Sequence, residues 1–103
     1  MARDRKDLSP KFKEILGSNN VYFQAPPVNQ MKYPCIIYFR DDRNVDHADN
    51  AIYRDHAHYT VTLIGANPDN DEIVDALLRL QYCSYDRRYI ADNYYHDVFD
   101  LYY

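Results

Sequence analysis

The residues of this chain best suited to chemistry are its four histidines, His47, His56, His58 and His96. In an extended segment, His56 and His58 project from the same face of a strand because they are two positions apart. Such a pair is able to hold a metal ion, and Asp46, Asp49 or Asp55 would be the residues to complete the site. Against this, Asp55 falls on the opposite face, His47 belongs to a polar loop, and no cysteine is near. The pattern favours a structural or solvent-exposed histidine pair, and we expect no metal and no cofactor.

Nucleophilic catalysis needs a serine, threonine or cysteine beside a positioned base. Ser9 is predicted to cap a helix, Ser18 lies in a turn, and Ser84 begins a strand without a diagnostic neighbour. The abundant aspartates are typical of turns and soluble loops. We therefore expect that the protein is not an enzyme, with a small metal-dependent nuclease that uses His56 or His58 as the enzymatic alternative.

Arg87 and Arg88, beside Tyr85 and Tyr89, combine basic and aromatic side chains in a way that suits nucleic acid. Consecutive strand residues face opposite ways, however, so the two arginines do not form one patch. We favour cross-strand ion pairs of these arginines with Asp97 or Asp100. The net charge of −4 and the pI near 5.4 also argue against a general nucleic-acid binder.

The first half of the chain predicts one helix and two strands. Apolar residues recur at helical spacing from Leu8 to Leu16, Ser9-Pro10 resembles a helix start, and Gly17 ends the pattern. Residues 21–23 suggest a short strand, and the apolar run Cys35–Phe39 is typical of a central strand. The chain is 103 residues long, which predicts a single domain over 1–103.

The second half predicts a strand, a helix and a hairpin. From Tyr53 to Ile64 the sequence alternates, so we expect Tyr59, Val61 and Leu63 to be buried and His56 and His58 to face away from that core. Asp69 and Glu72 suggest a capping box for a helix. That helix should bury one apolar face, made of Ile73, Val74, Leu77 and Leu78.

The C-terminal segment predicts two strands, Tyr82–Asp92 and Tyr94–Tyr103, joined by a tight turn at Asp92-Asn93. Seven of the 12 tyrosines lie in this segment. Tyrosine suits half-buried sheet faces and protein contacts because its apolar ring ends in a polar hydroxyl. The predicted fold class is α+β, in the order α-β-β-β-α-β-β, with a mainly antiparallel sheet covered on one face by two helices.

The polar residues 41–50 form a long connection in a small domain, and such loops are often functional. We therefore expect charged and histidine side chains in and beside this loop to contact a neighbouring subunit or a partner. These interface candidates are Arg40, Asp41, Asp42, Arg43, Asp46, Arg54, His56 and His58.

Cys35 and Cys83 are expected to be free thiols in a reducing compartment, because two isolated cysteines without a signal-like start do not suggest a disulfide framework. No segment approaches the length of a membrane span, so we expect a soluble intracellular protein without membrane contact.

Three phrases resemble the small tail-completion proteins of long-tailed bacteriophages, which are often called tail terminator or head-to-tail joining proteins. They are Ala25-Pro-Pro followed by Met31-Lys-Tyr-Pro-Cys-Ile-Ile-Tyr38, then His58-Tyr-Thr-Val-Thr-Leu-Ile-Gly-Ala-Asn-Pro-Asp69, and Tyr89-Ile-Ala-Asp-Asn-Tyr-Tyr-His-Asp-Val-Phe99. The resemblance runs from about Tyr22 to the C-terminus and includes no catalytic signature.

The resemblance implies a homo-hexameric ring that caps the tail tube, stops its polymerisation and docks on the head connector, or stopper, protein. It places the protein in the virion at the head-tail junction, after assembly in the host bacterial cytoplasm. The acidic balance fits a lumen through which DNA passes without specific binding. The alternatives are another head-tail connector component, such as a stopper or adaptor, or an adaptor or inhibitor of a host protein.

Overall fold

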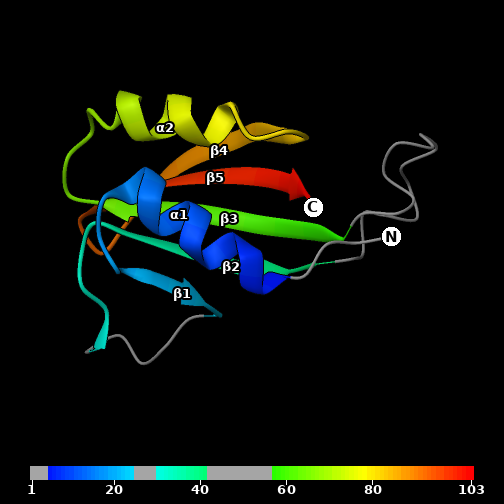
Figure 1. The fold of residues 1–103 in the computed structure, drawn as a ribbon. Helices are drawn as coiled ribbons and strands as arrows, with labels where there is room; N and C mark the ends of the chain where they lie inside the picture. The colour runs from blue at the N-terminus through cyan, green and yellow to red at the C-terminus, as the bar shows by residue number, and fades with distance from the viewer. Residues whose placement is uncertain (1–4, 25–29, 42–56) are drawn as a thin grey trace.

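The computed structural model describes residues 5–24, 30–41 and 57–103, and these form an α+β fold (Figure 1). A short 3₁₀ turn, η1 (Arg5–Asp7), leads directly into the first helix. The elements then follow in the order α1 (Leu8–Leu16), β1 (Val21–Phe23), β2 (Cys35–Arg40), β3 (His58–Gly65), α2 (Asp71–Leu78), β4 (Cys83–Ala91) and β5 (Tyr94–Tyr102). This order confirms the predicted fold class.

The described strands form one sheet in the order β1-β2-β3-β5-β4. β1 pairs with β2 in parallel, and the other neighbours are antiparallel. The apolar strand β2 is internal, as expected, but the middle position belongs to β3. Both helices lie on the same face of the sheet (Figure 1), which we call the covered face. The opposite face, which carries none of the described helices, is the helix-free face.

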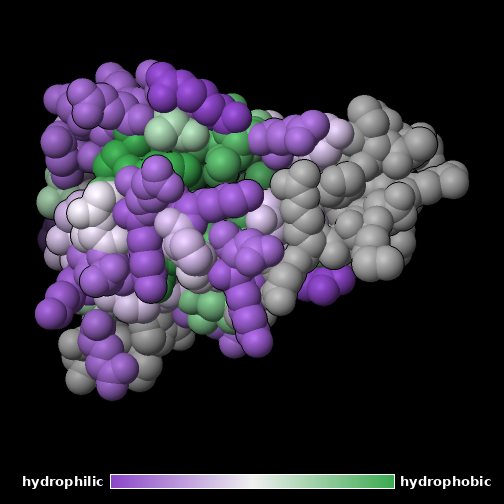
Figure 2. All heavy atoms as spheres, viewed as in Figure 1, coloured by the Kyte–Doolittle hydropathy of each residue, from purple (hydrophilic) through white to green (hydrophobic). Residues whose placement is uncertain are grey.

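The core forms where the helices meet the covered face. Leu8 and Phe12 of α1 and Leu77 of α2 are fully buried against Leu63 of β3 and Phe99 of β5. Tyr59, Val61 and Leu63 are all buried, so the predicted alternation of β3 is confirmed over the described residues. Residues 53–56 of the predicted strand lie outside the described part of the chain. Figure 2 shows an apolar strip between the two helices on an otherwise largely polar surface.

The start of α1 differs from the prediction. The chain is already helical at Leu8, so Ser9 is an interior residue and not the N-cap. Its hydroxyl is instead hydrogen-bonded to that of Tyr38 on β2. Pro10 is tolerated in this first turn because its missing N–H would have no helical partner there. Gly17 ends the helix as expected, at φ +80°, with its N–H donating to the carbonyl of Lys13.

The second helix also begins differently. The predicted capping box of Asp69 and Glu72 is wrong, because α2 starts at Asp71, and its N-cap, Asn70, makes no side-chain capping bond. The N–H of Asp69 donates to the side-chain oxygen of Asn67, an Asx-type turn that competes with capping. Leu78 was predicted to share the buried face with Leu77, but its side chain is 39% exposed.

The C-terminal hairpin forms as predicted. Asp92 and Asn93 have φ values of 52° and 66°, the positive angles that a two-residue type I′ turn requires. The turn sets the register in which Ala91 faces Tyr94 and Arg88 faces Asp97. A β-bulge between Tyr85 and Arg87 interrupts this register on the β4 side.

Candidate interface at the helix-free face and the sheet edge

The helix-free face mixes apolar, aromatic and polar side chains, as a contact surface does. By strand alternation and register, it consists of Cys35, Ile37, Phe39, His58, Thr60, Thr62, Ile64, Ser84, Arg87, Tyr89, Ala91, Tyr94, His96, Val98, Asp100 and Tyr102. Ile37, Thr60 and Thr62 are half-buried, and Phe39 is 39% exposed. A face of this kind leaves apolar area available to a partner, whereas the helices cover most of the covered face and leave an apolar strip between them (Figure 2).

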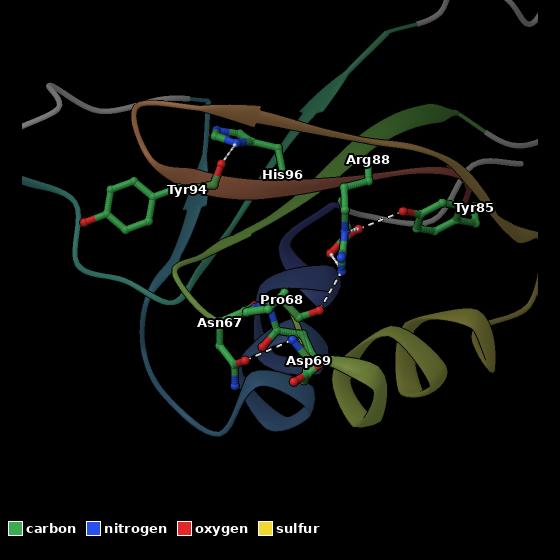
Figure 3. A network of polar contacts seen from close by, with 9 residues as sticks. Asn67, Pro68, Asp69, Tyr85, Arg88, Tyr94 and His96 are labelled. Carbon is green, nitrogen blue, oxygen red and sulfur yellow. Dashed lines mark hydrogen bonds and ion pairs between the residues drawn. The ribbon is translucent and has the colours of Figure 1, made fainter.

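An aromatic stack lies on this face beside the hairpin turn. The rings of Tyr89 and His96, which face each other across β4 and β5, stack with their centroids 4.6 Å apart. The guanidinium of Arg87 lies 5.9 Å from the centroid of Tyr89. The Nδ1 atom of His96 is 3.1 Å from the carbonyl oxygen of Tyr94 (Figure 3). The exposed Tyr89 ring is thereby held in one place, which lowers the entropy lost when a partner binds it.

His58 is the centre of a second polar cluster, at the other end of β3. Its Nε2 atom is 2.8 Å from Oδ1 of Asp100, and its Nδ1 atom is hydrogen-bonded to the backbone carbonyl of Asp41. The N–H of Asp41 donates in return to the carbonyl of His58. The ring also packs against Tyr102, with centroids 4.9 Å apart. One histidine therefore joins the end of β2 to β3 and β5.

This geometry corrects part of the expectation for the histidines. His58 does point away from the core, as alternation predicts, but it is buried and not in solvent. Both ring nitrogens are engaged with protein oxygens, so the side chain has a structural role. Burial of a polar ring is tolerated because its hydrogen bonds are made.

A third polar cluster, on the covered face, is built around the buried carboxylate of Asp97 (Figure 3). Arg88 donates to both oxygens of Asp97, at 2.8 and 3.2 Å, and the hydroxyl of Tyr85 donates to Oδ1 at 2.7 Å. Arg88 also donates to the carbonyl of Pro68, in the loop before α2. The predicted cross-strand pair of an arginine with Asp97 is thus confirmed, and it ties the hairpin to that loop.

The surroundings of Asp97 set its charge. Burial by itself raises the pKa of Asp97, but the hydrogen bonds from Arg88 and Tyr85 and the positive charge of Arg88 outweigh burial and hold the pKa below its ordinary value. Burial, followed by the bond to this carboxylate, raises the pKa of the Tyr85 hydroxyl. Asp97 is therefore an ionised, satisfied carboxylate rather than a proton donor.

The two cysteines are poor nucleophiles. Burial raises the pKa of Cys35 to about 11, and burial together with the charge of Asp100 raises that of Cys83 to about 11. Both are free and remain neutral thiols near pH 7, whereas a reactive cysteine needs a lowered pKa.

The described residues hold no group of three or more His, Cys, Asp or Glu side chains placed to bind a metal ion. Within the same ranges, no helix is both long and apolar enough to cross a membrane.

Of the eight interface candidates, the structure describes three. Asp41 and His58 are brought together in the cluster with Asp100, and Arg40 is exposed at the end of β2, opposite Tyr59. The other five lie outside the described residues: Asp42, Arg43, Asp46, Arg54 and His56. Asp100 was not foreseen as a partner of His58, because their contact depends on the register between β3 and β5.

Comparison with protein families, with curated proteins and with solved structures gives no match for this chain.

Proposed function

We propose that this chain is a structural virion protein of a long-tailed bacteriophage. In this proposal it caps the tail tube as a homo-hexameric ring, ends polymerisation of the tube and joins the tail to the head connector. The observation that carries the proposal is the placement of the three resembling phrases. They supply β2, β3 and the β4–β5 hairpin, which are neighbours in the sheet. Segments far apart in the sequence therefore make one continuous surface.

One ring contact and one close approach join these phrases at the end of the sheet near the hairpin turn. Tyr33, before β2, stacks on Tyr94 of β5 with ring centroids 4.1 Å apart. A side chain added at Gly65 of β3 would lie 3.5 Å from the ring of Pro34. All three phrases contribute to the end of the sheet near the hairpin turn. The segments that resemble tail-completion proteins are therefore adjacent in the folded chain.

A one-sided helix layer supports a role in assembly. The helices cover most of the covered face, whereas Ile37, Phe39 and Thr60 stay at least partly accessible on the helix-free face. This gives each subunit an area to bury against a neighbour, the tail tube or the connector. The Asp41–His58–Asp100 cluster fixes the rim of that area. A ring follows when such an interface is heterologous and its rotation closes.

Two further features support this proposal: the acidic charge balance, which suits passage of DNA, and the hydrogen bonds of His58, which argue against the nuclease alternative. The chain carries 16 acidic against 12 basic residues, so a lumen built from it would repel phosphates more than retain them. The nuclease alternative has less support, because both ring nitrogens of His58 are already engaged.

The test is electron microscopy of phage tails assembled with and without the protein. We expect tails of uncontrolled length that fail to join heads in its absence, and a six-fold ring at the tail end when it is supplied. Tails of normal length without the protein, or a protein that never reaches the tail end, would contradict the proposal.

A matched pair of variants examines the helix-free face in the same assay. Phe39→Asp places a charge on that face, whereas Leu78→Asp places one on α2, at a side chain of equal exposure, 39%. We expect Phe39→Asp to abolish tail completion and Leu78→Asp to preserve it, with both variants folded by circular dichroism. The reverse result would move the interface to the helices.

A further inference from the structure

β4 forms one long edge of the sheet of described strands. It spans nine residues, its ladder partner within the described part of the chain is β5, and its side chains from Ser84 to Ile90 are exposed. Ile90 is 66% exposed, although it is a large apolar residue. The opposite edge, β1, has only three residues. A long edge strand invites pairing with another strand unless something restricts it.

The restriction is the bulge. Tyr85 faces Phe99 and Arg87 faces Val98, so Asp86 has no partner on β5. Asp86 and Arg87 consequently project from the same, helix-free face, and their side chains form an ion pair at 2.6 Å. The side chains of a regular strand alternate strictly between the two faces of a sheet, whereas those of β4 change phase at the bulge. A regular strand added to β4 would therefore pair side chains of the same face on one side of the bulge and side chains of opposite faces on the other.

A second copy of β4 does not have this problem. When two copies run antiparallel about a two-fold axis between Asp86 and Arg87, the two bulges lie opposite each other. The facing pairs are then Asp86 with Arg87, Tyr85 with Arg88, Ser84 with Tyr89, and Cys83 with Ile90, each taken once from either copy. In every pair both side chains project from the same face, since the bulge shifts the two halves of β4 by one residue.

Charge complementarity selects the same register. It places Asp86 of each copy opposite Arg87 of the other, so the exposed pair within one copy becomes two pairs across the axis. It also covers the exposed Ile90 with Cys83 of the other copy. We propose that the free protein forms a two-fold dimer through β4, which makes one continuous sheet from both copies. This goes beyond the ring at the tail end and concerns the chain before it meets a tail.

Charge reversal with the full chain tests the dimer, with native mass spectrometry and sedimentation equilibrium as readouts. Asp86→Arg or Arg87→Asp alone places like charges opposite each other, and we expect each to weaken dimerisation at least about tenfold. An equimolar mixture of the two variants restores opposite charges across the axis and should form a heterodimer. The double variant with both changes should dimerise again with itself.

Correct folding is checked by thermal unfolding of each single variant at a dilution at which the parent is monomeric. The curves should then match the parent's because the side chains of Arg87 and Asp86 are 63% and 39% exposed. A parent protein that is monomeric at all concentrations overturns the proposal. So does a dimer that ignores all the charge changes, or a mixture that stays monomeric. If the protein forms a hexamer that is insensitive to these changes, the β4 contact is wrong but the proposed ring is unaffected. If tails have normal length without the protein, the proposed ring is wrong but the β4 dimer is unaffected.

Discussion

The two faces of the same sheet differ in what they bury. On the covered face, Phe12 of α1 and Leu77 of α2 join Leu63 in one continuous apolar core. On the helix-free face, buried residues such as Cys35 and Val98 alternate with half-buried and exposed ones, and they are not part of that core. The comparison indicates that the covered face supplies most of the stability, while the helix-free face remains available for contacts.

Within the described part of the chain, each face contains one buried side chain of a polar or charged residue other than tyrosine, and the two are satisfied differently. Asp97, on the covered face, is held by side chains of β4, so its partners come from within the hairpin. His58, on the helix-free face, is held by Asp100 of β5 and by the backbone of Asp41, the residue that follows β2. Asp97 therefore fixes the hairpin, whereas His58 fixes the arrangement of three strands.

The largest difference in stability between the two faces is expected when one phenylalanine on each face is truncated to alanine. Phe12→Ala should lower the free energy of unfolding by about 3–5 kcal/mol, because it opens a cavity in a fully buried site. Phe39→Ala, on the helix-free face, should cost less than about 1 kcal/mol. Urea unfolding measures both, and equal losses would show that the two faces stabilise the fold alike.

A smaller effect is expected from the ion pair on the covered face. Arg88→Met leaves the Asp97 carboxylate buried with only Tyr85 as a donor, and we expect a loss of about 1–3 kcal/mol. The matched control is Arg87→Met on the same strand, measured at a dilution at which the chain is monomeric. Its partner Asp86 is exposed, so we expect an effect below about 0.5 kcal/mol. If both variants unfolded at the same urea concentration, the buried Arg88–Asp97 pair would contribute no more to stability than the exposed Arg87–Asp86 pair.

The pH dependence of stability provides a finer test of Asp97. Because its pKa is lower in the folded protein than in the unfolded chain, its contribution is present above the ordinary aspartate pKa of about 4 and is lost as pH falls through the lowered value. The melting temperature should therefore fall more steeply in acid for the parent than for Asp97→Asn. Parallel curves for the two proteins would contradict this assignment.

The smallest effect concerns thiol reactivity and involves no change in sequence. Cys35 is fully buried with a pKa of about 11, so it should react with a thiol reagent only when the protein unfolds. Cys83 is partly exposed and should react slowly in the native state. Rapid labelling of Cys35 at neutral pH would show that the helix-free face opens more easily than its burial implies.

The sequence predicted the features that depend on near neighbours. The apolar spacing from Leu8 to Leu16, the alternation from Tyr59 to Leu63, and the Asp92-Asn93 turn each reflect a backbone or periodicity preference within a few residues. For this reason the fold class and element order were predictable. Element starts were less so, because Ser9 and Asp69 found partners other than the ones that a local capping pattern assigns.

The sequence by itself determined which residues form helices and strands and which side chains of β3 enter the core, because periodicity is a local property of the chain. The tertiary structure alone decided that His58 is buried against Asp100, and that Tyr85 joins Arg88 at the carboxylate of Asp97. The first contact depends on the register of β3 and β5, which are distant in the sequence. The second depends on the bulge at Asp86, which shifts the pairing of β4 so that Tyr85 faces Phe99 on the covered face. A one-residue shift reverses the direction of every side chain that follows, so only the assembled sheet fixes these partners.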